Sequence, residues 1–106
     1  LSIEVVPGEL RTVVRIIDGF GTLVFAGGRD DIDEALGALE AGQALAVVIG
    51  ETRVDTVWAH RFGDVAEGEP LCYIDSTGRL ALAVNRGSAA ERYGAARRSP
   101  ISITRA

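Results

Sequence analysis

The chain has 106 residues, of which 47% are hydrophobic and 25% charged, and its formal net charge is −4. This length and composition predict one folded domain with one core and exclude a disordered segment. The scattered, mildly acidic charge argues against a nucleic-acid or membrane partner, and no apolar run approaches the roughly 20 residues that a membrane-spanning helix needs. The start carries no signal-peptide pattern, and we expect a cytoplasmic protein. Because the chain begins with Leu1 rather than Met, we expect a fragment of a longer protein or a processed one.

Short β-strands dominate the pattern of apolar and β-branched residues. Turn signals such as Pro7-Gly8 and Asp18-Gly19 separate them. Many short strands with closely spaced turns favour an all-β fold, so we predict an antiparallel, β-barrel-like domain of about seven or eight short strands. The expected strands cover residues 2–6, 10–18, 22–26, 44–49, 53–62, 71–74, 80–84 and 101–104.

Two helices are expected among the strands. The first covers residues 30–41, with Asp30 as its N-cap and Gly42 just after its end. The second is a short helix near residues 88–93, where Ser88 begins the Ser-x-x-Glu pattern of a capping box. The first helix is expected to bury an apolar stripe at helical spacing, formed by Ile32, Ala35, Leu36 and Leu39.

The chain has one Cys, one Trp and one His. Cys72 lies in an apolar strand, where we expect a buried core residue, and a lone Cys excludes an internal disulfide and a CxxC zinc site. Trp58 and His60 share one face of a strand. With no second His, this pattern favours a packed Trp and a hydrogen-bonded or surface His over a metal site. We therefore expect neither a metal nor a catalytic Ser-His-Asp set in this chain.

The stretch from Leu71 to Gly94 carries most of its polar side chains at two turns. One short apolar strand joins these turns, so both can face a single ligand from two directions. We expect half of a binding site here, with the other half in another domain. On spacing alone, Asp18 and Ser76 are ordinary turn formers. The two turns are Asp75-Ser76-Thr77 and Asn85-Arg86-Gly87-Ser88.

Two blocks of the sequence resemble one enzyme family. The longer block, residues 63–94, reads GDVAEGEPLCYIDSTGRLALAVNRGSAAERYG. The shorter block is Ile17-Asp18-Gly19-Phe20-Gly21. In order and spacing both are similar to the C-terminal domain of the S-adenosylmethionine (SAM) hydroxide adenosyltransferases, which are SAM hydrolases related to the fluorinase and chlorinase enzymes. The resemblance covers nearly the whole chain.

The resemblance implies that residues 1–106 form a single C-terminal β-barrel domain, and that a catalytic N-terminal α/β domain belongs to the parent protein. It implies a homotrimer in which SAM binds between the N-terminal domain of one subunit and the C-terminal domain of its neighbour. The implied reaction is attack of water on the ribose C5′ of SAM, which gives adenosine and methionine. SAM or adenosine is then the partner and SAM the substrate, so no cofactor is expected. The chain alone is not expected to be active.

Carried over by position, the resemblance implies substrate-binding roles for this chain and no catalytic ones. Asp18 would meet the methionine ammonium, since a carboxylate suits an ammonium. Ser76 and Thr77 would hold the amino-acid end of SAM, and Phe20 would line the pocket. The residues along the adenine edge, partly through backbone groups, would be Asn85, Arg86 and Gly87.

The sequence departs from the family pattern beside the shorter block. Thr22 stands where the family usually has an Asn that bonds adenine, and Asp75 also stands where Asn is usual. Thr22 offers one hydroxyl in place of an amide, so it cannot make the same paired contact. These departures leave an alternative open, namely a diverged, non-catalytic binding or trimerisation module of the same barrel type. A peptide-binding module of PDZ type is disfavoured, because that fold needs more than the 12 residues that follow Gly94.

Overall fold

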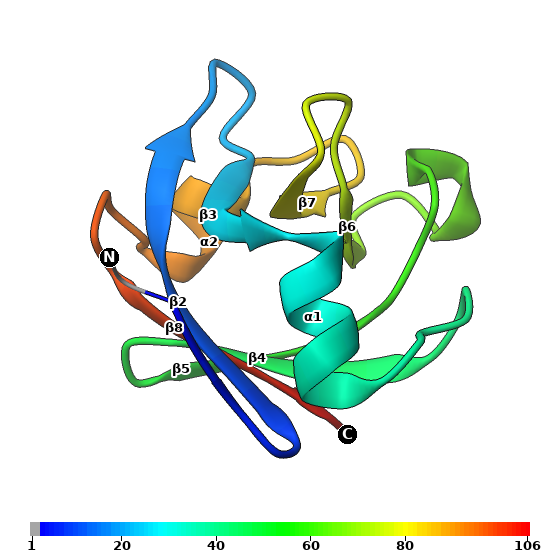
Figure 1. Ribbon diagram of the computed structural model, residues 1–106. Helices are drawn as coiled ribbons and strands as arrows, with labels where there is room; N and C mark the ends of the chain where they lie inside the picture. The colour runs from blue at the N-terminus through cyan, green and yellow to red at the C-terminus, as the bar shows by residue number, and fades with distance from the viewer. Residues whose placement is uncertain (1–2) are drawn as a thin grey trace.

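The strands of the protein form one antiparallel sheet that curves into a barrel (Figure 1). The computed structural model describes residues 3–106. Its eight strands are β1 (Glu4–Val6), β2 (Glu9–Ile17), β3 (Leu23–Gly28), β4 (Ala44–Ile49), β5 (Thr52–Val57), β6 (Pro70–Ile74), β7 (Arg79–Val84) and β8 (Pro100–Arg105). Neighbours follow the order β5-β4-β8-β2-β3-β7-β6, and β1 pairs with β2 off this path. The predicted all-β, barrel-like fold is confirmed.

The two strands at the ends of this order approach each other and nearly close the barrel. Trp58, just after β5, pairs with Cys72 of β6 in a parallel bridge. The Ala59 N–H also donates to the Cys72 carbonyl oxygen at 2.9 Å. Near-closure leaves few unpaired edge groups. It also carries the connection between β5 and β6 past the end of β7, where the Gly68 N–H donates to the Asn85 carbonyl oxygen at 2.7 Å.

β5 ends at Val57, short of the predicted end of this strand. The Asp64 carboxylate accepts the N–H groups of His60 at 2.9 Å and Arg61 at 3.3 Å, and the chain turns into a short 3-10 helix, η1 (Phe62–Asp64). The His60 N–H is the main reason why the pKa of Asp64 lies below its ordinary value. The alternation of side chains continues past the true end, so the pattern alone predicted too long a strand.

The first helix, α1 (Arg29–Leu36), begins one residue earlier than predicted. Its N-cap is Gly28, not Asp30. The Asp31 carboxylate accepts the Gly28 N–H at 2.9 Å, which satisfies a donor at the helix start. Asp30 lies in the first turn instead, where its charge favours the helix dipole.

α1 also ends earlier than predicted, at Gly37 rather than at Gly42. The Arg105 guanidinium donates to the carbonyl oxygens of Leu36 at 3.0 Å and Ala38 at 3.3 Å, so β8 satisfies acceptors that a longer helix would have used. Leu39 is buried as predicted, with 7% of its surface exposed, but it belongs to the irregular segment that follows the helix. The helical spacing of Leu39 therefore predicted a helix that is too long at its C-terminal end.

The second helix, α2 (Ala89–Tyr93), has the predicted position. The Ser88 hydroxyl accepts the Glu91 N–H at 3.1 Å, as an N-cap does. Gly94 ends the helix in the left-handed conformation that C-terminal glycines often adopt. The Ala90 N–H donates to the Gly21 carbonyl oxygen at 3.0 Å, so the helix is tied to the turn between β2 and β3.

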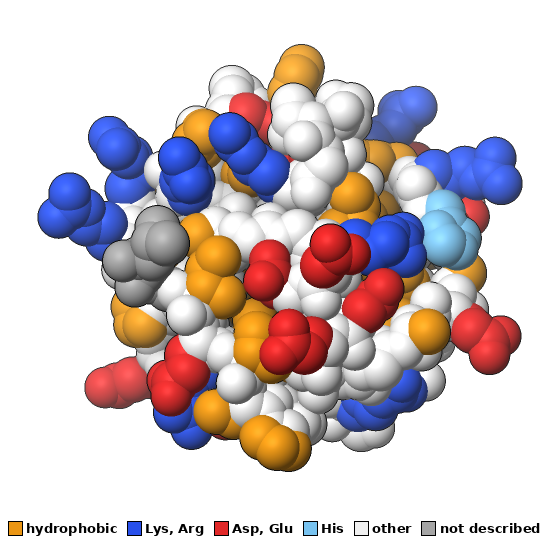
Figure 2. Space-filling model, viewed as in Figure 1, with side chains coloured by type: hydrophobic (Ala, Val, Ile, Leu, Met, Phe, Trp, Pro, Cys, Tyr) orange, Lys and Arg blue, Asp and Glu red, His pale blue; other side chains and the backbone are white. Residues whose placement is uncertain are grey.

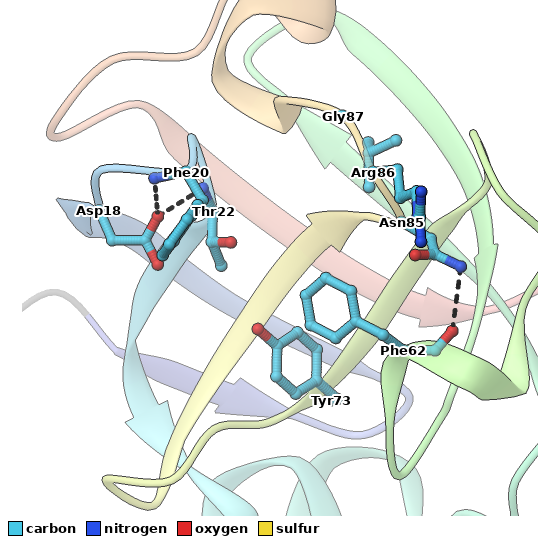
Figure 3. A pocket seen from close by; sticks show the side chains of 9 residues that line it. Asp18, Phe20, Thr22, Phe62, Tyr73, Asn85, Arg86 and Gly87 are labelled. Carbon is cyan, nitrogen blue, oxygen red and sulfur yellow. Dashed lines mark hydrogen bonds between the residues drawn. The ribbon is translucent and has the colours of Figure 1, made fainter.

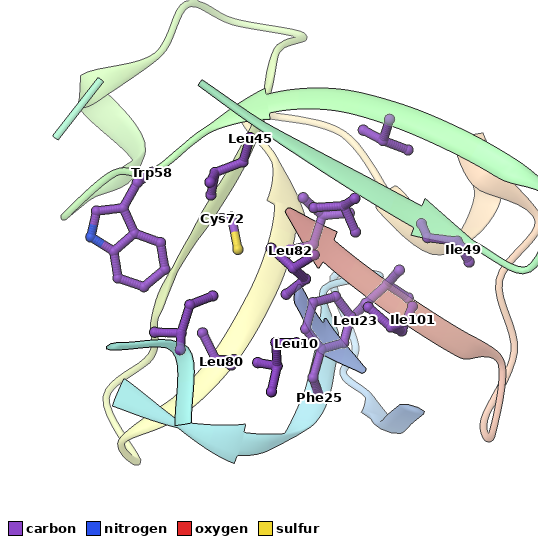
Figure 4. Packing of buried hydrophobic residues seen from close by; sticks show 14 of the residues in the cluster. Leu10, Leu23, Phe25, Leu45, Ile49, Trp58, Cys72, Leu80, Leu82 and Ile101 are labelled. Atoms are coloured by element: carbon purple, nitrogen blue, oxygen red, sulfur yellow. The ribbon is translucent and has the colours of Figure 1, made fainter. Parts of the chain in front are cut away.

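The inward faces of the strands and of α1 form one apolar core (Figure 4). Leu10, Phe25 and Trp58 are among its largest fully buried side chains. The Arg29 guanidinium carbon lies 5.9 Å from the centroid of the Trp58 ring, so a cation covers this aromatic. Cys72 is fully buried, as predicted, and burial raises the pKa of its thiol to about 12. A thiol held neutral in this way is unsuited to act as a nucleophile.

The outer surface shows a modest separation of charge. On the face seen in Figure 2, acidic side chains gather over α1, and arginines lie mainly toward the rim. Asp30 and Asp31 in the first turn of α1 belong to this acidic region. Within residues 3–106, no helix is long and apolar enough to cross a membrane.

Candidate functional site

The turn from Asp18 to Thr22 joins β2 to β3 and is organised by one carboxylate. Oδ1 of Asp18 accepts the N–H groups of Phe20 at 2.8 Å and Thr22 at 3.0 Å (Figure 3). In the main chain, the Asp18 N–H donates to the Thr22 carbonyl oxygen at 3.1 Å, and the Gly21 N–H donates to that of Asp18 at 3.0 Å. This Asx-type turn uses Oδ1 alone. Oδ2 has no hydrogen-bond partner among the described residues.

The turn from Asp75 to Arg79 joins β6 to β7 and has the same hydrogen-bond plan. Oδ1 of Asp75 accepts the N–H groups of Thr77 at 2.9 Å and Arg79 at 3.0 Å, and it also accepts the Thr77 hydroxyl at 2.7 Å. The Asp75 N–H donates to the Arg79 carbonyl oxygen at 2.8 Å, and the Gly78 N–H donates to that of Asp75 at 3.0 Å. Partial burial alone raises the pKa of Asp75, but these hydrogen bonds outweigh it and hold the pKa below its ordinary value.

A third segment, from Val84 to Ser88, lies against the first turn. Arg86 has a positive φ of 58°, which is uncommon for a residue other than glycine. A Cβ added at Gly87 would lie 2.8 Å from Val84 Cγ1, so a larger residue at this position would force the chain apart. A Cβ added at Gly21 would overlap the Ser88 hydroxyl, which shows how closely the two segments pack.

The first turn and the segment from Val84 to Ser88 line an open pocket of about 590 Å³ (Figure 3). Six of the eight predicted site residues line it: Asp18, Phe20, Thr22, Asn85, Arg86 and Gly87. The structure therefore brings together residues that lie more than sixty positions apart in the chain. Three further residues line the pocket without a sequence signal for this role: Phe62, Tyr73 and Val84.

The other two predicted residues, Ser76 and Thr77, line a neighbouring hollow of about 440 Å³. Asp18, Thr22 and Tyr73 line both spaces, so the hollow continues from the pocket. The remaining residues of the hollow are Ile16, Val24, Asp75 and Arg79. The predicted site is thus a bipartite surface with one shared wall.

Aromatic side chains form much of the pocket wall. Phe20 is 84% exposed and Phe62 is 40% exposed, which is unusual for large apolar side chains. The rings of Phe62 and Tyr73 pack edge to face, with centroids 5.6 Å apart and planes at 73°. Burial raises the pKa of the Tyr73 phenol, and the nearby carboxylates of Asp18 and Asp75 raise it further. Tyr73 therefore stays a neutral phenol at physiological pH.

Asn85 differs from the other predicted residues because its side-chain amide bonds to the protein itself. Its side-chain Nδ2 donates to the carbonyl oxygens of Phe62 at 3.3 Å and Val65 at 3.0 Å, and Figure 3 shows the first of these bonds. The amide is thus engaged with the connection between β5 and β6. The sequence signal for this role was absent, since both acceptors are backbone groups at least twenty residues away.

Among the described residues, no group of three or more His, Cys, Asp or Glu side chains is arranged to hold a metal ion. The carboxylates of Asp18 and Asp75 and the guanidinium of Arg79 all line the hollow. The surface therefore offers carboxylate oxygens, a guanidinium, free hydroxyls and exposed rings. Such a set can bind a ligand with a flat ring at one end and charged groups at the other.

Comparison with known proteins identifies the family of this domain. Residues 12–102 match the family model of the SAM hydroxide adenosyltransferase C-terminal domain. The chain belongs to this family. The match includes both turns and the segment from Val84 to Ser88, so every predicted site residue of this SAM hydroxide adenosyltransferase domain lies inside it.

Two curated relatives carry the name (R)-S-adenosyl-L-methionine hydrolase. The relative from Salinispora tropica is 46% identical over 52 residues, which are 49% of this chain and 20% of that protein. The relative from Thermus thermophilus is 42% identical over 57 residues, which are 54% of this chain and 22% of that protein. The matched segment therefore spans about a fifth of the length of either hydrolase.

Two solved structures share the fold. A conserved protein from Thermotoga maritima superimposes with a TM-score of 0.92 and 28% identity, over 99% of this chain and 39% of that one. A conserved protein from Thermus thermophilus gives a TM-score of 0.62 and 32% identity, over 88% of this chain and 34% of that one. In both, the domain seen here corresponds to a minor part of a longer chain.

Proposed function

We propose that this chain is the SAM-contacting C-terminal domain of a SAM hydrolase, an enzyme that converts SAM and water to adenosine and methionine. The observation that carries the proposal is the pocket itself. It gathers six of the eight residues that the family resemblance assigns to substrate, from two separate segments of the chain. The neighbouring hollow supplies the other two.

The pocket suits the adenosine part of SAM. A purine ring presents flat faces to aromatic side chains, and Phe20 and Phe62 are exposed beside this space. The edge of the purine presents donors and acceptors, which the Arg86 backbone and the Gly87 carbonyl oxygen can meet. The Gly87 N–H is already engaged, since it donates to the Val84 carbonyl oxygen at 3.0 Å. The missing Cβ at Gly87 lets this backbone pack closely on the Val84 side chain, which keeps the segment in place beside the pocket.

The hollow suits the amino-acid part of SAM. Oδ2 of Asp18 can accept from an ammonium while Oδ1 continues to hold the turn. Thr77 already donates its hydroxyl hydrogen to Asp75, so the Ser76 hydroxyl is the free donor of the pair. The Arg79 guanidinium, which lines the same hollow, can balance the methionine carboxylate.

The pocket also needs a second wall. An aromatic side chain that is 84% exposed, as Phe20 is, gains apolar contacts only when another surface covers it. We propose that the N-terminal domain of a neighbouring subunit supplies this wall in a homotrimer. The matched segment is about a fifth of each hydrolase, so most of either relative lies outside this domain and leaves room for the part that would form the wall.

In the proposed reaction, water attacks C5′ of the ribose, the C5′–S bond breaks and neutral methionine leaves with the electron pair. The attacking water loses its proton to a group of the other domain. This chain binds and orients the substrate: Asp18 fixes the ammonium, and the aromatic wall fixes the purine. Holding both ends of SAM leaves C5′ in a defined place between them.

A second candidate function is a diverged module that binds or trimerises without catalysis. Two observations favour it. Thr22 replaces an amide that the family usually offers to adenine, and the amide of Asn85 is engaged with Phe62 and Val65. The purine edge therefore meets fewer free donors and acceptors than the family pattern implies, which lowers its expected affinity.

Calorimetry of the full-length protein with SAM and with adenosine tests the proposal. Asp18→Asn retains a side-chain oxygen for the turn but removes the negative charge. We expect this variant to bind SAM about 10-fold more weakly or worse, because it loses a charge-assisted bond. Adenosine has no ammonium, so its affinity stays within about 2-fold. Asp55→Asn, at an exposed position of β5, is the matched control and changes neither affinity.

Absence of SAM binding in the unmodified protein contradicts the proposal. If Asp18→Asn weakens the binding of SAM and of adenosine equally, the result contradicts the role given to this carboxylate. Tight binding of both ligands without any release of methionine supports the non-catalytic module instead.

A further inference from the structure

The chain between β5 and β6 forms a loop, residues 61–69, that reaches the pocket and carries Phe62 into its wall. Within the loop, the backbone makes three hydrogen bonds: Asp64 N–H to Arg61, Val65 N–H to Phe62 and Glu69 N–H to Ala66. Three short-range bonds are few for nine residues. The position of the 61–69 loop therefore depends on what it contacts elsewhere.

Asn85 supplies most of that contact. Its side-chain Nδ2 donates to the carbonyl oxygens of Phe62 at 3.3 Å and Val65 at 3.0 Å. Its own carbonyl oxygen accepts the Gly68 N–H at 2.7 Å, and its N–H donates to the Glu69 carbonyl oxygen at 3.0 Å. Main chain and side chain of one residue thus hold both ends of the 61–69 loop.

This arrangement limits what the Asn85 side chain can offer to a ligand. An amide NH2 group has two hydrogens, and the two loop carbonyls within hydrogen-bond distance of Nδ2 take one each. Its oxygen can still accept, but it cannot donate. A paired contact with a purine edge needs a donor and an acceptor together, so the Asn85 side chain cannot make one without releasing the loop.

We propose that Asn85 is a positioning residue, which holds the 61–69 loop so that Phe62 stands against Tyr73 as a wall of the pocket. The edge-to-face packing of these rings, with centroids 5.6 Å apart, is the part of the pocket that the loop completes. Arg92 of α2 adds a second tie, since its Nη1 donates to the Gly68 carbonyl oxygen at 2.6 Å. The identity of the nucleoside ligand in the following test rests on the proposed function, but the tie itself does not.

Hydrogen exchange of the full-length protein without ligand tests the tie directly. Asn85→Ala removes both side-chain donors, and Asn85→Asp replaces them with an oxygen that faces two carbonyl oxygens. We expect amide exchange within residues 61–69 to become about 10-fold faster or more in either variant. Arg92→Ala removes the more exposed tie and gives a smaller increase. The amides of β2 and β8 serve as the internal control and keep their protection unless the whole domain unfolds.

Nucleoside binding tests the consequence, with adenosine and inosine as probes. Inosine has a carbonyl where adenosine has an amino group, so a side chain that contacts this edge discriminates between them. We expect Asn85→Ala to weaken the binding of both nucleosides by the same factor, about 10-fold. The ratio of the two dissociation constants then stays unchanged. Combining Asn85→Ala with Phe62→Ala adds little to Phe62→Ala alone, because both changes remove the same wall.

The outcomes separate the claims. Unchanged exchange in the 61–69 loop of Asn85→Ala overturns the positioning role. A changed adenosine-to-inosine ratio in Asn85→Ala, or full additivity with Phe62→Ala, also overturns it and makes Asn85 a direct contact. If the unmodified protein binds neither nucleoside, the proposed function fails, while the exchange measurement still decides the positioning role.

Discussion

The turns Asp18–Thr22 and Asp75–Arg79 share one hydrogen-bond plan and differ in their surroundings. In each, Oδ1 of the leading Asp accepts two N–H groups, and a glycine with positive φ occupies the fourth position. Gly21 packs against Ser88, whereas a Cβ added at Gly78 would meet nothing within 4 Å. The position of Gly21 is thus filled by Ser88, whereas the position of Gly78 is open. The second turn packs instead through its carbonyl oxygen, because a Cβ added at Gly28 would lie 2.7 Å from the Gly78 carbonyl oxygen.

The side chains follow the same division. Phe20, in the first turn, extends 84% exposed beside the pocket. Thr77, at the matching position of the second turn, bends its hydroxyl back to Asp75 at 2.7 Å. One backbone motif therefore serves two purposes: the first turn presents an aromatic ring, and the second presents short polar groups. What each turn presents to a ligand follows from the side chain at its third position, Phe20 in one and Thr77 in the other.

The largest expected difference between the turns is in stability. Gly21→Ala and Gly78→Ala both place a Cβ at a φ above 80°, which costs about 1 kcal/mol. Gly21→Ala also overlaps Ser88, so we expect a total loss of about 3 kcal/mol in the free energy of unfolding. Chemical denaturation of both variants measures the difference. Equal losses would show that the packing against Ser88 relaxes freely.

A smaller difference is expected in the dependence of stability on pH. The pKa of Asp75 lies below its ordinary value in the folded protein, so its ionised form stabilises the fold. This contribution, about 1 kcal/mol for a partly exposed carboxylate, is complete above the unfolded pKa of about 3.9 and disappears as pH falls through the lower folded pKa. Unfolding of the wild type and of Asp75→Asn should therefore converge on acidification. A gap that stays constant down to about pH 2 contradicts this origin.

The smallest expected effect concerns the purine edge beside the first turn. Thr22→Asn restores the amide that the family usually has, and its backbone bond to Asp18 is unaffected. We expect adenosine and SAM to bind about 3-fold to 10-fold more tightly, since both share the purine and gain one hydrogen bond. Calorimetry on the full-length protein measures both. A gain for SAM alone would place Thr22 at the amino-acid end instead.

Much of the fold could be predicted from the sequence because strands and tight turns leave local signals. The Asp-Gly pair at Asp18 marked one hairpin, and the Ser-x-x-Glu pattern at Ser88 marked α2. The end of α1 could not be predicted, because Arg105 satisfies the carbonyl oxygens of Leu36 and Ala38 from a distant strand. Leu39 kept the helical spacing while it packed from a non-helical segment.

In the site, too, residues with a local sequence signal could be predicted, and contacts between distant parts of the chain could not. Residues within the two family-like blocks could be predicted, and the structure gathers them around one bipartite surface. Phe62 was missed because the alternating pattern made it look like the end of a strand, while the Asp64 carboxylate turns the chain there. The engagement of Asn85 could not be predicted either, since no sequence pattern records a side chain that bonds to distant backbone.

The most direct test of the account compares SAM cleavage by the full-length protein with cleavage by residues 1–106 alone. Products are separated by chromatography after incubation with SAM. The account predicts adenosine and methionine in equal amounts from the full-length protein and none from the isolated domain, because the pocket described here is one wall of the site. A full-length protein that neither binds nor cleaves SAM would contradict the account, and so would turnover by the isolated domain.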